Sequence, residues 1–328
     1  MTEPRKIEKR IATGFAIEAD GLKKSFPGER APEIRAVDGI SFNVSPSEIF
    51  GLVGPDGAGK TTTLRMLAGI MPPDAGSATV AGCDVIRDPE RAKHSLGYMP
   101  QRFGLYEDLT VDENIRFYAD LFGVRGEERK TRSTQLLTAA GMSEFRARRA
   151  GNLSGGMKQK LGLVCALIHK PKVILLDEPT TGVDPVSRRD FWRILYELAA
   201  EGVAILTSTA YLDEAERCHR VALMNQGRLL FCDTPSNLKD GFSKGVLSVT
   251  SPEPRDLRTE LEHAEGISSL VLTGDGAHLV VDDAARRIPE IETRLKKAQV
   301  AFDSVQQVEP TIEDLFVDAV AGEEVTHA

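Results

Sequence analysis

One eight-residue segment constrains this chain more than any other. "GPDGAGKT", residues 54–61, fits the pattern G-x-x-x-x-G-K-[S/T], and it lies between the apolar run "IFGLV" and the helical pattern "TTTLRMLAGI". Glycines in such a loop let backbone N–H groups turn inward around phosphate oxygens, and the following helix directs its positive end at the same anion. The segment predicts an α/β fold that binds the phosphates of a nucleoside triphosphate.

The loop residues receive specific expected roles. Lys60 is expected to reach the β- and γ-phosphates, the Thr61 hydroxyl to coordinate Mg²⁺, and Thr62 to hydrogen-bond the α-phosphate. A chance match in a glycine-containing loop is the alternative, and the strand and helix patterns on either side argue against it. The nucleotide-binding residues predicted from this segment are Gly54, Pro55, Asp56, Gly57, Ala58, Gly59, Lys60, Thr61 and Thr62.

A pair of acidic residues ends a second apolar run. "VILLDEPT", residues 173–180, reads as a strand that delivers Asp177 to the carboxyl edge of a sheet, where ligands bind in such folds. We expect Asp177 to hold Mg²⁺ and Glu178 to polarise the attacking water as catalytic base. Adjacent acids after a strand are more often a solvated strand end, but the phosphate loop earlier in the chain favours the catalytic interpretation.

A third segment, "NLSGGMKQK", begins another helix. Ser154, Gly155 and Gly156 would stand at its N-terminus and form a second anion-binding helix end. A serine cap followed by flexible glycines is the alternative interpretation. Because one chain then carries two phosphate-binding helix ends far apart in sequence, a head-to-tail dimer, in which this segment covers the partner's γ-phosphate, is one arrangement that uses both.

The elements divide the chain into parts of different character. Strand and helix patterns alternate over residues 15–238, and the strands stop over about 106–160, which predicts a helical subdomain in an α/β core. Residues 240–328 read as strand, helix, hairpin, helix, strand and helix, an accessory α+β domain. Residues 1–14 are charged and are expected to form a disordered tail.

Three helix ends are predicted from capping patterns. Thr110 and Glu113 have the spacing of a capping box. Thr311 is expected to cap the last helix, and Pro289 to stand in the first turn of the helix before it.

Composition limits the partners. The net charge of −8 gives the chain no overall excess of positive charge for binding nucleic acid, so no nucleic-acid partner is expected. The four cysteines are scattered, which argues against a disulfide framework or a zinc site. No run approaches the roughly 20 apolar residues that span a bilayer, so work at a membrane would require docking on another chain.

Taken together, the segments resemble those of ATP-binding-cassette (ABC) transporter ATPases over nearly the whole chain. The matching segments are "GPDGAGKTT", "YMPQ", "LSGGMKQ", "ILLDEPTTGVDP" and "DEAE". The resemblance implies that the chain binds and hydrolyses ATP with Mg²⁺ and pairs with a second cassette, either a copy of itself or another chain. It also implies separate transmembrane permease subunits and a cytoplasmic position on the inner face of the cell membrane.

The resemblance assigns three further residues. Gln101 in "YMPQ" would contact Mg²⁺ and the attacking water, and the residues after it would face the membrane subunit. Asp184 in "GVDP" would cross the dimer interface to the partner's ATP. Phe26 in "LKKSFPG" would stack on adenine, with a core phenylalanine as the alternative.

The C-terminal segment narrows the resemblance. "EPTIEDLFVDAV" is similar to the end of drug-efflux exporter ATPases of the daunorubicin-resistance type, and "STAYLDEAE" is similar to the first cassette of YbhF-type tandem ATPases. Both serve export permeases, so the resemblance implies a multidrug-efflux-like motor and a regulatory role for residues 240–328.

One family position departs from the pattern. The family has a histidine where Ala210 stands, and its imidazole would hydrogen-bond the γ-phosphate and keep water in line with Glu178. A methyl group can do neither, so we expect firm ATP binding with slow hydrolysis, or dependence on a second cassette. His219, nine residues further on, is a candidate to replace the missing histidine, and a surface or packing role is the alternative interpretation. Asp56 replaces the usual asparagine and adds negative charge beside the phosphates.

Two other functions fit part of the pattern. A soluble ABC protein of translation or DNA repair usually carries two cassettes, coiled-coil insertions or zinc cysteines, and one phosphate loop with an acidic balance argues against it. A regulator that binds nucleotide without hydrolysis is consistent with Ala210, but Glu178 argues against it.

Overall fold

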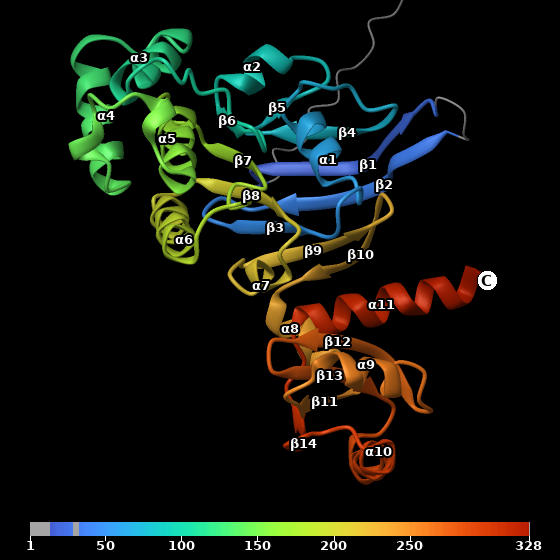
Figure 1. The fold of residues 1–328 in the computed structure, drawn as a ribbon. Helices are drawn as coiled ribbons and strands as arrows, with labels where there is room; N and C mark the ends of the chain where they lie inside the picture. The colour runs from blue at the N-terminus through green and yellow to red at the C-terminus, as the bar shows by residue number, and fades with distance from the viewer. Residues whose placement is uncertain (1–13, 29–32, 328) are drawn as a thin grey trace, which may run out of the picture. The chain divides into compact units, whose positions relative to one another are not determined.

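The structure is a computed structural model that describes residues 14–28 and 33–327 (Figure 1). The predicted disordered tail, residues 1–14, lies outside the described residues except for Gly14. Contacts divide the chain into two compact units, and each is described separately below. The strands form three sheets with the orders β2-β1-β4-β5, β10-β9-β3-β8-β7-β6 and β12-β13-β11-β14.

The first unit contains described residues up to Phe50, then Gly57–Thr209 and Gln226–Arg228. Its strands are β1 (Ile17–Phe26), β2 (Ile34–Val44), the start of β3 (Ile49–Val53), β4 (Ala75–Val80), β5 (Cys83–Asp84), β6 (Leu96–Met99), β7 (Val173–Asp177) and β8 (Ala204–Thr209). Its helices are α1 (Lys60–Leu67), α2 (Pro89–Lys93), α3 (Val111–Leu121), α4 (Gly126–Ala139), α5 (Gly155–Leu167) and α6 (Pro185–Ala200), with 3₁₀ turns at Ser143–Phe145 and Ala150–Asn152.

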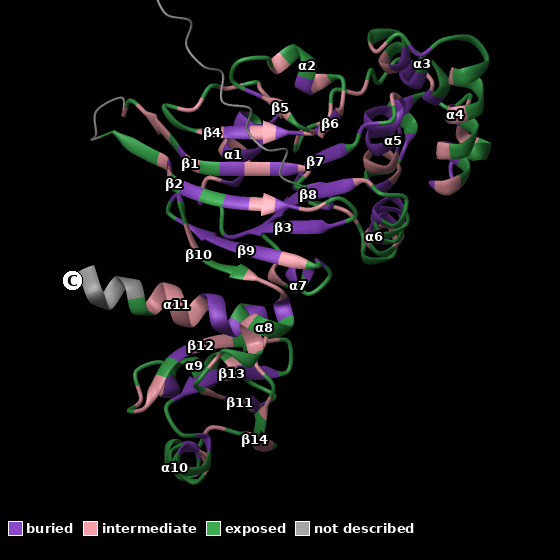
Figure 2. Ribbon diagram, turned by 180° about the vertical axis from the view of Figure 1, so that it is seen from behind, coloured by how far each residue is buried: buried purple, intermediate pink, exposed green. Residues whose placement is uncertain are grey.

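Three parallel strands deliver polar residues to one edge. β6 pairs with β7, and β7 pairs with β8, so that Asp177 lies opposite Ser208. Every residue of β7 and β8 is buried, as Figure 2 shows. Burial on both faces explains why these strands read as continuous apolar runs rather than as alternating patterns. Their carboxyl ends place acidic and hydroxyl side chains side by side.

The predicted helical stretch consists of α3, α4 and α5, which gather beside β6 and β7 in Figure 1. The capping box at α3 is confirmed, because the Thr110 hydroxyl accepts from the Glu113 N–H and the Glu113 carboxylate accepts from the Thr110 N–H. The Arg132 guanidinium of α4 donates to the Leu167 carbonyl at 2.6 Å and to the Ile168 carbonyl. Arg132 thereby satisfies the C-terminal carbonyls of α5 and joins the two helices.

The second unit contains residues 51–56, 210–225 and 229–328. Its elements, after the end of β3, are α7 (Leu212–Ala215), β9 (Arg220–Asn225), β10 (Arg228–Asp233, of which Arg228 belongs to the first unit), α8 (Pro235–Asp240), β11 (Gly245–Thr250), α9 (Pro254–Leu261), β12 (Ile267–Thr273), β13 (Gly276–Val281), α10 (Ala284–Ala298), β14 (Ser304–Val308) and α11 (Ile312–His327). From β11 onward this is the predicted order of strand, helix, hairpin, helix, strand and helix.

The C-terminal sheet is antiparallel and has helices on it. Side chains of α9 and α10 form a hydrophobic core with β11 and β13; the core consists of Leu247, Val249, Leu257, Leu261, Ala277, Leu279, Val281, Ala284, Ile291 and Leu295. α11 contacts β12, and it also contacts α7 and α8 of the same unit. Thr311 caps α11 as predicted, since its hydroxyl accepts from the Asp314 N–H at 3.2 Å.

The prediction for Pro289 is wrong. α10 begins at Ala284, and Pro289 lies inside the helix rather than in its first turn. The reason is a cap that lies further upstream, because the Asp283 carboxylate accepts from the Arg286 N–H at 3.1 Å. The helix tolerates the proline although the missing N–H leaves the carbonyl four residues before it without its helical donor.

A histidine–carboxylate pair joins β13 to α11. His278 Nδ1 lies 3.2 Å from both carboxylate oxygens of Asp314, whose residue is 1% exposed. The hydrogen bond to Asp314 raises the pKa of His278 although burial opposes the shift. Burial would raise the pKa of Asp314, but hydrogen bonds from His278 and Thr311 outweigh it and lower that pKa.

The pair predicts a pH-dependent contribution to stability. A raised pKa in the folded state means that His278 stabilises the fold below its ordinary pKa and that this contribution is lost as pH rises through the raised value. We therefore expect His278→Gln to lower the melting temperature by a few degrees at about pH 5.5 and by less at about pH 8.5. The exposed His263, changed to glutamine, is the matched control. Equal losses for His278→Gln at both pH values would contradict the prediction.

Candidate functional site

The phosphate loop joins a buried strand to a helix whose N-cap residue is a glycine and has no side chain to cap it. β3 is buried throughout, and Gly57 and Gly59 follow with φ of 80° and 105°, values that favour glycine. The N-cap residue of α1 is Gly59, and no acidic residue lies in the first turn of this helix. The Gly227 N–H donates to the Ala58 carbonyl at 3.0 Å and supports the loop. The helix start is therefore suited to bind an anion.

Three residues far apart in sequence meet beside this loop. Lys60, on α1, is 4% exposed, and its Nζ lies 3.4 Å from Glu178 Oε1. Gln101, which follows β6, donates from Nε2 to Glu178 Oε2 at 2.8 Å. The structure thus brings together the predicted phosphate-binding lysine, the predicted base and the glutamine assigned by resemblance.

A second contact joins the residues predicted to bind Mg²⁺. Thr61 Oγ1 donates to Asp177 Oδ1 at 2.9 Å, and Asp177 is 1% exposed. A hydroxyl and a carboxylate are the oxygen ligands that Mg²⁺ uses beside substrate phosphates. The residues present therefore fit the ion: Thr61 and Asp177 adjoin, and Gln101 reaches the neighbouring Glu178.

Glu178 has an unusual backbone conformation. Its φ is 48°, in the left-handed region that residues with a side chain rarely adopt. Its N–H donates to the Ser208 carbonyl at 3.2 Å and to the Ser208 hydroxyl at 3.1 Å. The Ser208 hydroxyl in turn donates to Asp177 Oδ1 at 2.7 Å. Ser208 is not among the residues predicted from the sequence, although the polar "TST" that ends an apolar strand was a signal for it.

The predicted partner-facing residues lie at the starts of α5 and α6. The Ser154 hydroxyl caps α5 by accepting from the Met157 N–H at 3.3 Å, and Ser154 and Gly155 are exposed. Gly156 is buried, and a Cβ added there would stand 2.6 Å from Ser187 of α6. The two helix starts therefore pack directly against each other through a position that has no room for a side chain.

Asp184 caps α6 in this structure. Its carboxylate accepts from the Ser187 N–H at 2.9 Å and from the Val186 N–H at 3.1 Å. These hydrogen bonds, that from Ser187 foremost, lower the pKa of Asp184. A carboxylate held this way is ionised and rigidly placed at an exposed helix end.

Four other predicted positions lie as follows. Phe26 ends β1 and is half-buried, with the Lys24 ammonium 5.9 Å from its ring centroid. Asp56 is exposed in the phosphate loop. Ala210 is exposed and directly follows the last residue of β8. His219 is exposed and precedes β9, which agrees with the surface alternative.

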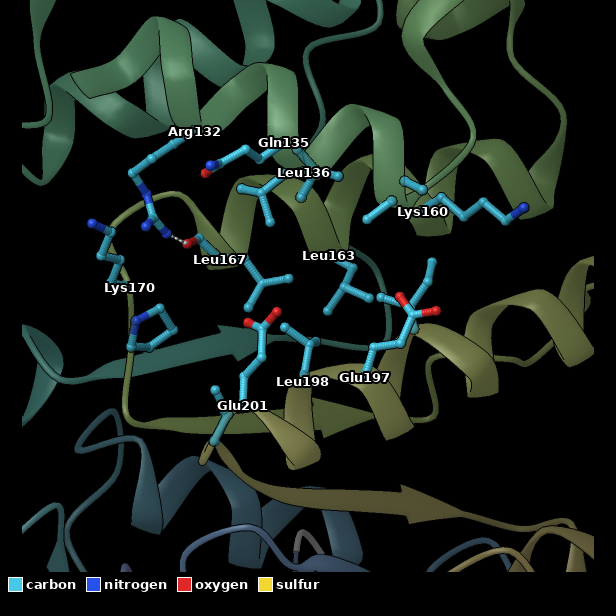
Figure 3. A pocket seen from close by; sticks show the side chains of 16 residues that line it. Arg132, Gln135, Leu136, Lys160, Leu163, Leu167, Lys170, Glu197, Leu198 and Glu201 are labelled. Carbon is cyan, nitrogen blue, oxygen red and sulfur yellow. Dashed lines mark hydrogen bonds between the residues drawn. The ribbon is translucent and has the colours of Figure 1, made fainter. Parts of the chain in front are cut away.

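A separate cavity of about 640 Å³ lies between α4, α5 and α6 (Figure 3). Figure 3 shows Leu136, Leu163, Leu167 and Leu198 around its centre, with charged side chains at its rim. Residues of α5 and α6 that line the cavity lie toward the C-terminal ends of these helices, whereas Ser154 and Asp184 stand at their starts. The predicted site residues do not line it.

Two family models match the chain. One, described as "ABC transporter", matches residues 37–181, which include the phosphate loop, the "LSGGMKQ" segment and the acidic pair. The other, described as "ATP-binding protein DrrA1-3-like, C-terminal domain", matches residues 234–320.

Similar proteins extend the match along the chain. "Probable multidrug ABC transporter ATP-binding protein YbhF" of Escherichia coli (strain K12) is 45% identical over 316 residues, which is 93% of this chain and 52% of that protein. The chain thus spans about half the length of this relative. "Daunorubicin resistance ATP-binding protein DrrA2" of Streptomyces coeruleorubidus is 34% identical over 309 residues, which is 93% of this chain and 94% of that protein.

A solved structure shares the fold. "Structure of ATP binding subunit of ABC transporter" superimposes with a TM-score of 0.61 and 30% sequence identity, and it covers 69% of this chain and 92% of that one. The predicted fold class, a P-loop α/β fold, is confirmed by this match. Within residues 14–28 and 33–327, none of the helices has the length and apolar content to cross a membrane.

Proposed function

The chain belongs to the ABC transporter family of ATP-binding proteins, and we propose that it hydrolyses ATP to drive a separate membrane permease in export. The observation that carries the proposal is the contact of the buried Lys60 and Glu178 with each other and with the exposed Gln101 at the start of α1. An ammonium, an amide and a carboxylate at a phosphate-binding loop are the groups that phosphoryl transfer to water requires.

In the proposed reaction, the loop N–H groups and Lys60 would hold the β- and γ-phosphates, while Thr61, Asp177 and Gln101 would hold Mg²⁺. When bound, the ion supplies Lewis-acid polarisation of phosphate oxygens. Glu178 accepts a proton as water attacks the γ-phosphorus, the bond to the bridging oxygen breaks, and ADP and phosphate leave. Lys60 pairs with Glu178 in this structure, and a bound phosphate would replace the carboxylate as the partner of Lys60.

The proposed ATP site is completed by a second cassette. Ser154, Gly155 and Gly156 at the start of α5, together with Asp184, would cover the ATP held by a head-to-tail partner. Supporting this, Ser154, Gly155 and Asp184 are exposed at adjoining helix ends. Phe26 remains a candidate for stacking on adenine, since it is half-buried at the end of β1.

The names of the relatives suggest the exported compounds. YbhF is named as a probable multidrug transporter protein and DrrA2 as a daunorubicin resistance protein. We propose that this chain, too, serves a drug-efflux exporter from the inner face of the cell membrane. Residues 15–238 would form its ATP-binding part and residues 240–328 its accessory, regulatory part.

One observation favours a second candidate function. Ala210 offers no polar group where the family places a histidine, as a regulator that binds ATP without hydrolysis would tolerate. Phosphate release by the purified protein, absent from a Glu178→Gln variant, distinguishes the motor from such a regulator.

A lysine substitution tests the proposed nucleotide site. Lys60→Ala should weaken binding of Mg-ATP by about ten- to a hundredfold, because a charge-assisted contact to phosphate is lost. Binding is measured by titration with N-methylanthraniloyl-ATP, and phosphate release is measured in parallel. The exposed Lys130, changed to alanine, is the matched control. Native affinity in Lys60→Ala would refute the assignment of this site.

A further inference from the structure

We propose that Ser208 is a positioning residue that orients the Asp177 carboxylate directly and the Glu178 side chain through the Glu178 backbone. The inference rests on the proposed ATPase function and assigns a role to a residue outside the phosphate loop and the acidic pair. Ser208 is fully buried on β8, opposite Asp177 in the parallel ladder. Its single hydroxyl touches Asp177 and Glu178 at once.

The first part of the role concerns Asp177. Both hydroxyl donors, Thr61 at 2.9 Å and Ser208 at 2.7 Å, bind the same carboxylate oxygen, Oδ1. Two donors at one oxygen restrict the rotation of the carboxylate, and Oδ2 would be the oxygen available to Mg²⁺ or its water ligands. Because Thr61 would also hold Mg²⁺, Ser208 would be the donor that keeps Asp177 oriented with the ion in place.

The second part concerns Glu178. Its left-handed backbone, with φ of 48°, is strained for a residue with a side chain and persists only where neighbours enforce it. Ser208 supplies two acceptors to the Glu178 N–H, its carbonyl at 3.2 Å and its hydroxyl at 3.1 Å. The backbone turn directs the Glu178 side chain toward Lys60 and Gln101, so Ser208 acts on the base through the main chain.

Ser208 brings a polar side-chain group to this strand end, whereas Ala210, two positions further along the chain, has none. The hydroxyl of Ser208 donates its one hydrogen to Asp177 and accepts from the Glu178 N–H, so it serves both acidic residues. Removing it leaves Asp177 with the Thr61 hydroxyl as donor and the Glu178 N–H with the Ser208 carbonyl as acceptor.

The test compares Ser208→Ala with Thr207→Ala in the full chain. Thr207 is the neighbouring buried hydroxyl on β8, and its side chain points to the opposite face of the sheet. The readouts are the Mg²⁺ concentration that gives half-maximal binding of N-methylanthraniloyl-ATP, and kcat and KM for ATP. Thermal melting shows which variants are folded.

We expect Ser208→Ala to raise the half-maximal Mg²⁺ concentration by about ten- to a hundredfold and to lower kcat more than it raises KM. Ser208→Thr should restore most of the Mg²⁺ response, because it keeps the hydroxyl. If Ser208→Ala does not fold, Ser208→Cys keeps the volume with a weaker donor and should show the same shift in part.

The outcomes separate this inference from the proposed function. A Ser208→Ala or folded Ser208→Cys protein with the Mg²⁺ response of Thr207→Ala overturns the positioning role, even when the native protein hydrolyses ATP. A native protein that binds Mg-ATP but releases no phosphate overturns the proposed hydrolysis, while a shifted Mg²⁺ response in Ser208→Ala still supports the role of Ser208 toward Asp177.

Discussion

Replacing Glu178 by glutamine is expected to lower the rate of ATP hydrolysis by about 10²- to 10⁴-fold, the contribution typical of a general base. Glutamine has nearly the same shape and can keep the 2.8 Å contact with Gln101, but it cannot accept a proton from water. Phosphate release under saturating Mg-ATP measures the effect. Nucleotide binding should persist, because Lys60 and the loop N–H groups remain.

The same variant also tests the dimer. A protein that binds ATP but does not cleave it should accumulate as a head-to-tail dimer when Mg-ATP is present, and light scattering measures this mass. The exposed Glu201, changed to glutamine, is the control for loss of a carboxylate elsewhere. If Glu178→Gln hydrolyses ATP at the native rate, Glu178 is not the catalytic base. If the variant stays monomeric with Mg-ATP, the proposed dimer of two copies of this chain is wrong.

Introducing a histidine at Ala210 is expected to raise the hydrolysis rate by about 10²-fold, the size of one well-placed polar contact in a transition state. Ala210 is exposed at the end of β8, so a larger side chain has room there. The imidazole would hydrogen-bond the γ-phosphate and hold water toward Glu178. Steady-state phosphate release of native protein and Ala210→His gives the comparison.

Two controls make the histidine result specific. Ala210→Val adds bulk without a polar group and should leave the rate unchanged. Ala210→His combined with Glu178→Gln should stay inactive, because the histidine aligns water but does not replace the base. Should the native protein already turn over rapidly and the histidine add nothing, the explanation of slow hydrolysis is wrong.

Local patterns predicted the parts of the site that lie within one short segment. The spacing in "GPDGAGKT" predicted a helix after the loop, and α1 starts at Lys60. The capping pair Thr110 and Glu113 was readable for the same reason, because both residues belong to one helical turn. The apolar run of β7 predicted a buried strand that ends at Asp177. In each case the chemistry depends on neighbours in sequence.

The features that were missed depend on distant strands or on unusual backbone. Ser208 touches the acidic pair only because β8 lies beside β7, and sequence spacing does not fix that register. The left-handed conformation of Glu178 is not encoded by its residue type. Pro289 was assigned to a first turn because proline favours that position in general, but the Asp283 cap sets the start of α10 further upstream.

The missing side chain at Gly156 has a mechanical consequence. Because α5 and α6 touch there at their starts, with Ser187 filling the space that a Cβ would need, neither helix end can shift without displacing the other. Ser154 caps one helix and Asp184 the other. If a partner subunit binds as proposed, a displacement of Ser154 would also move Asp184, so the two helix ends would respond to the partner together.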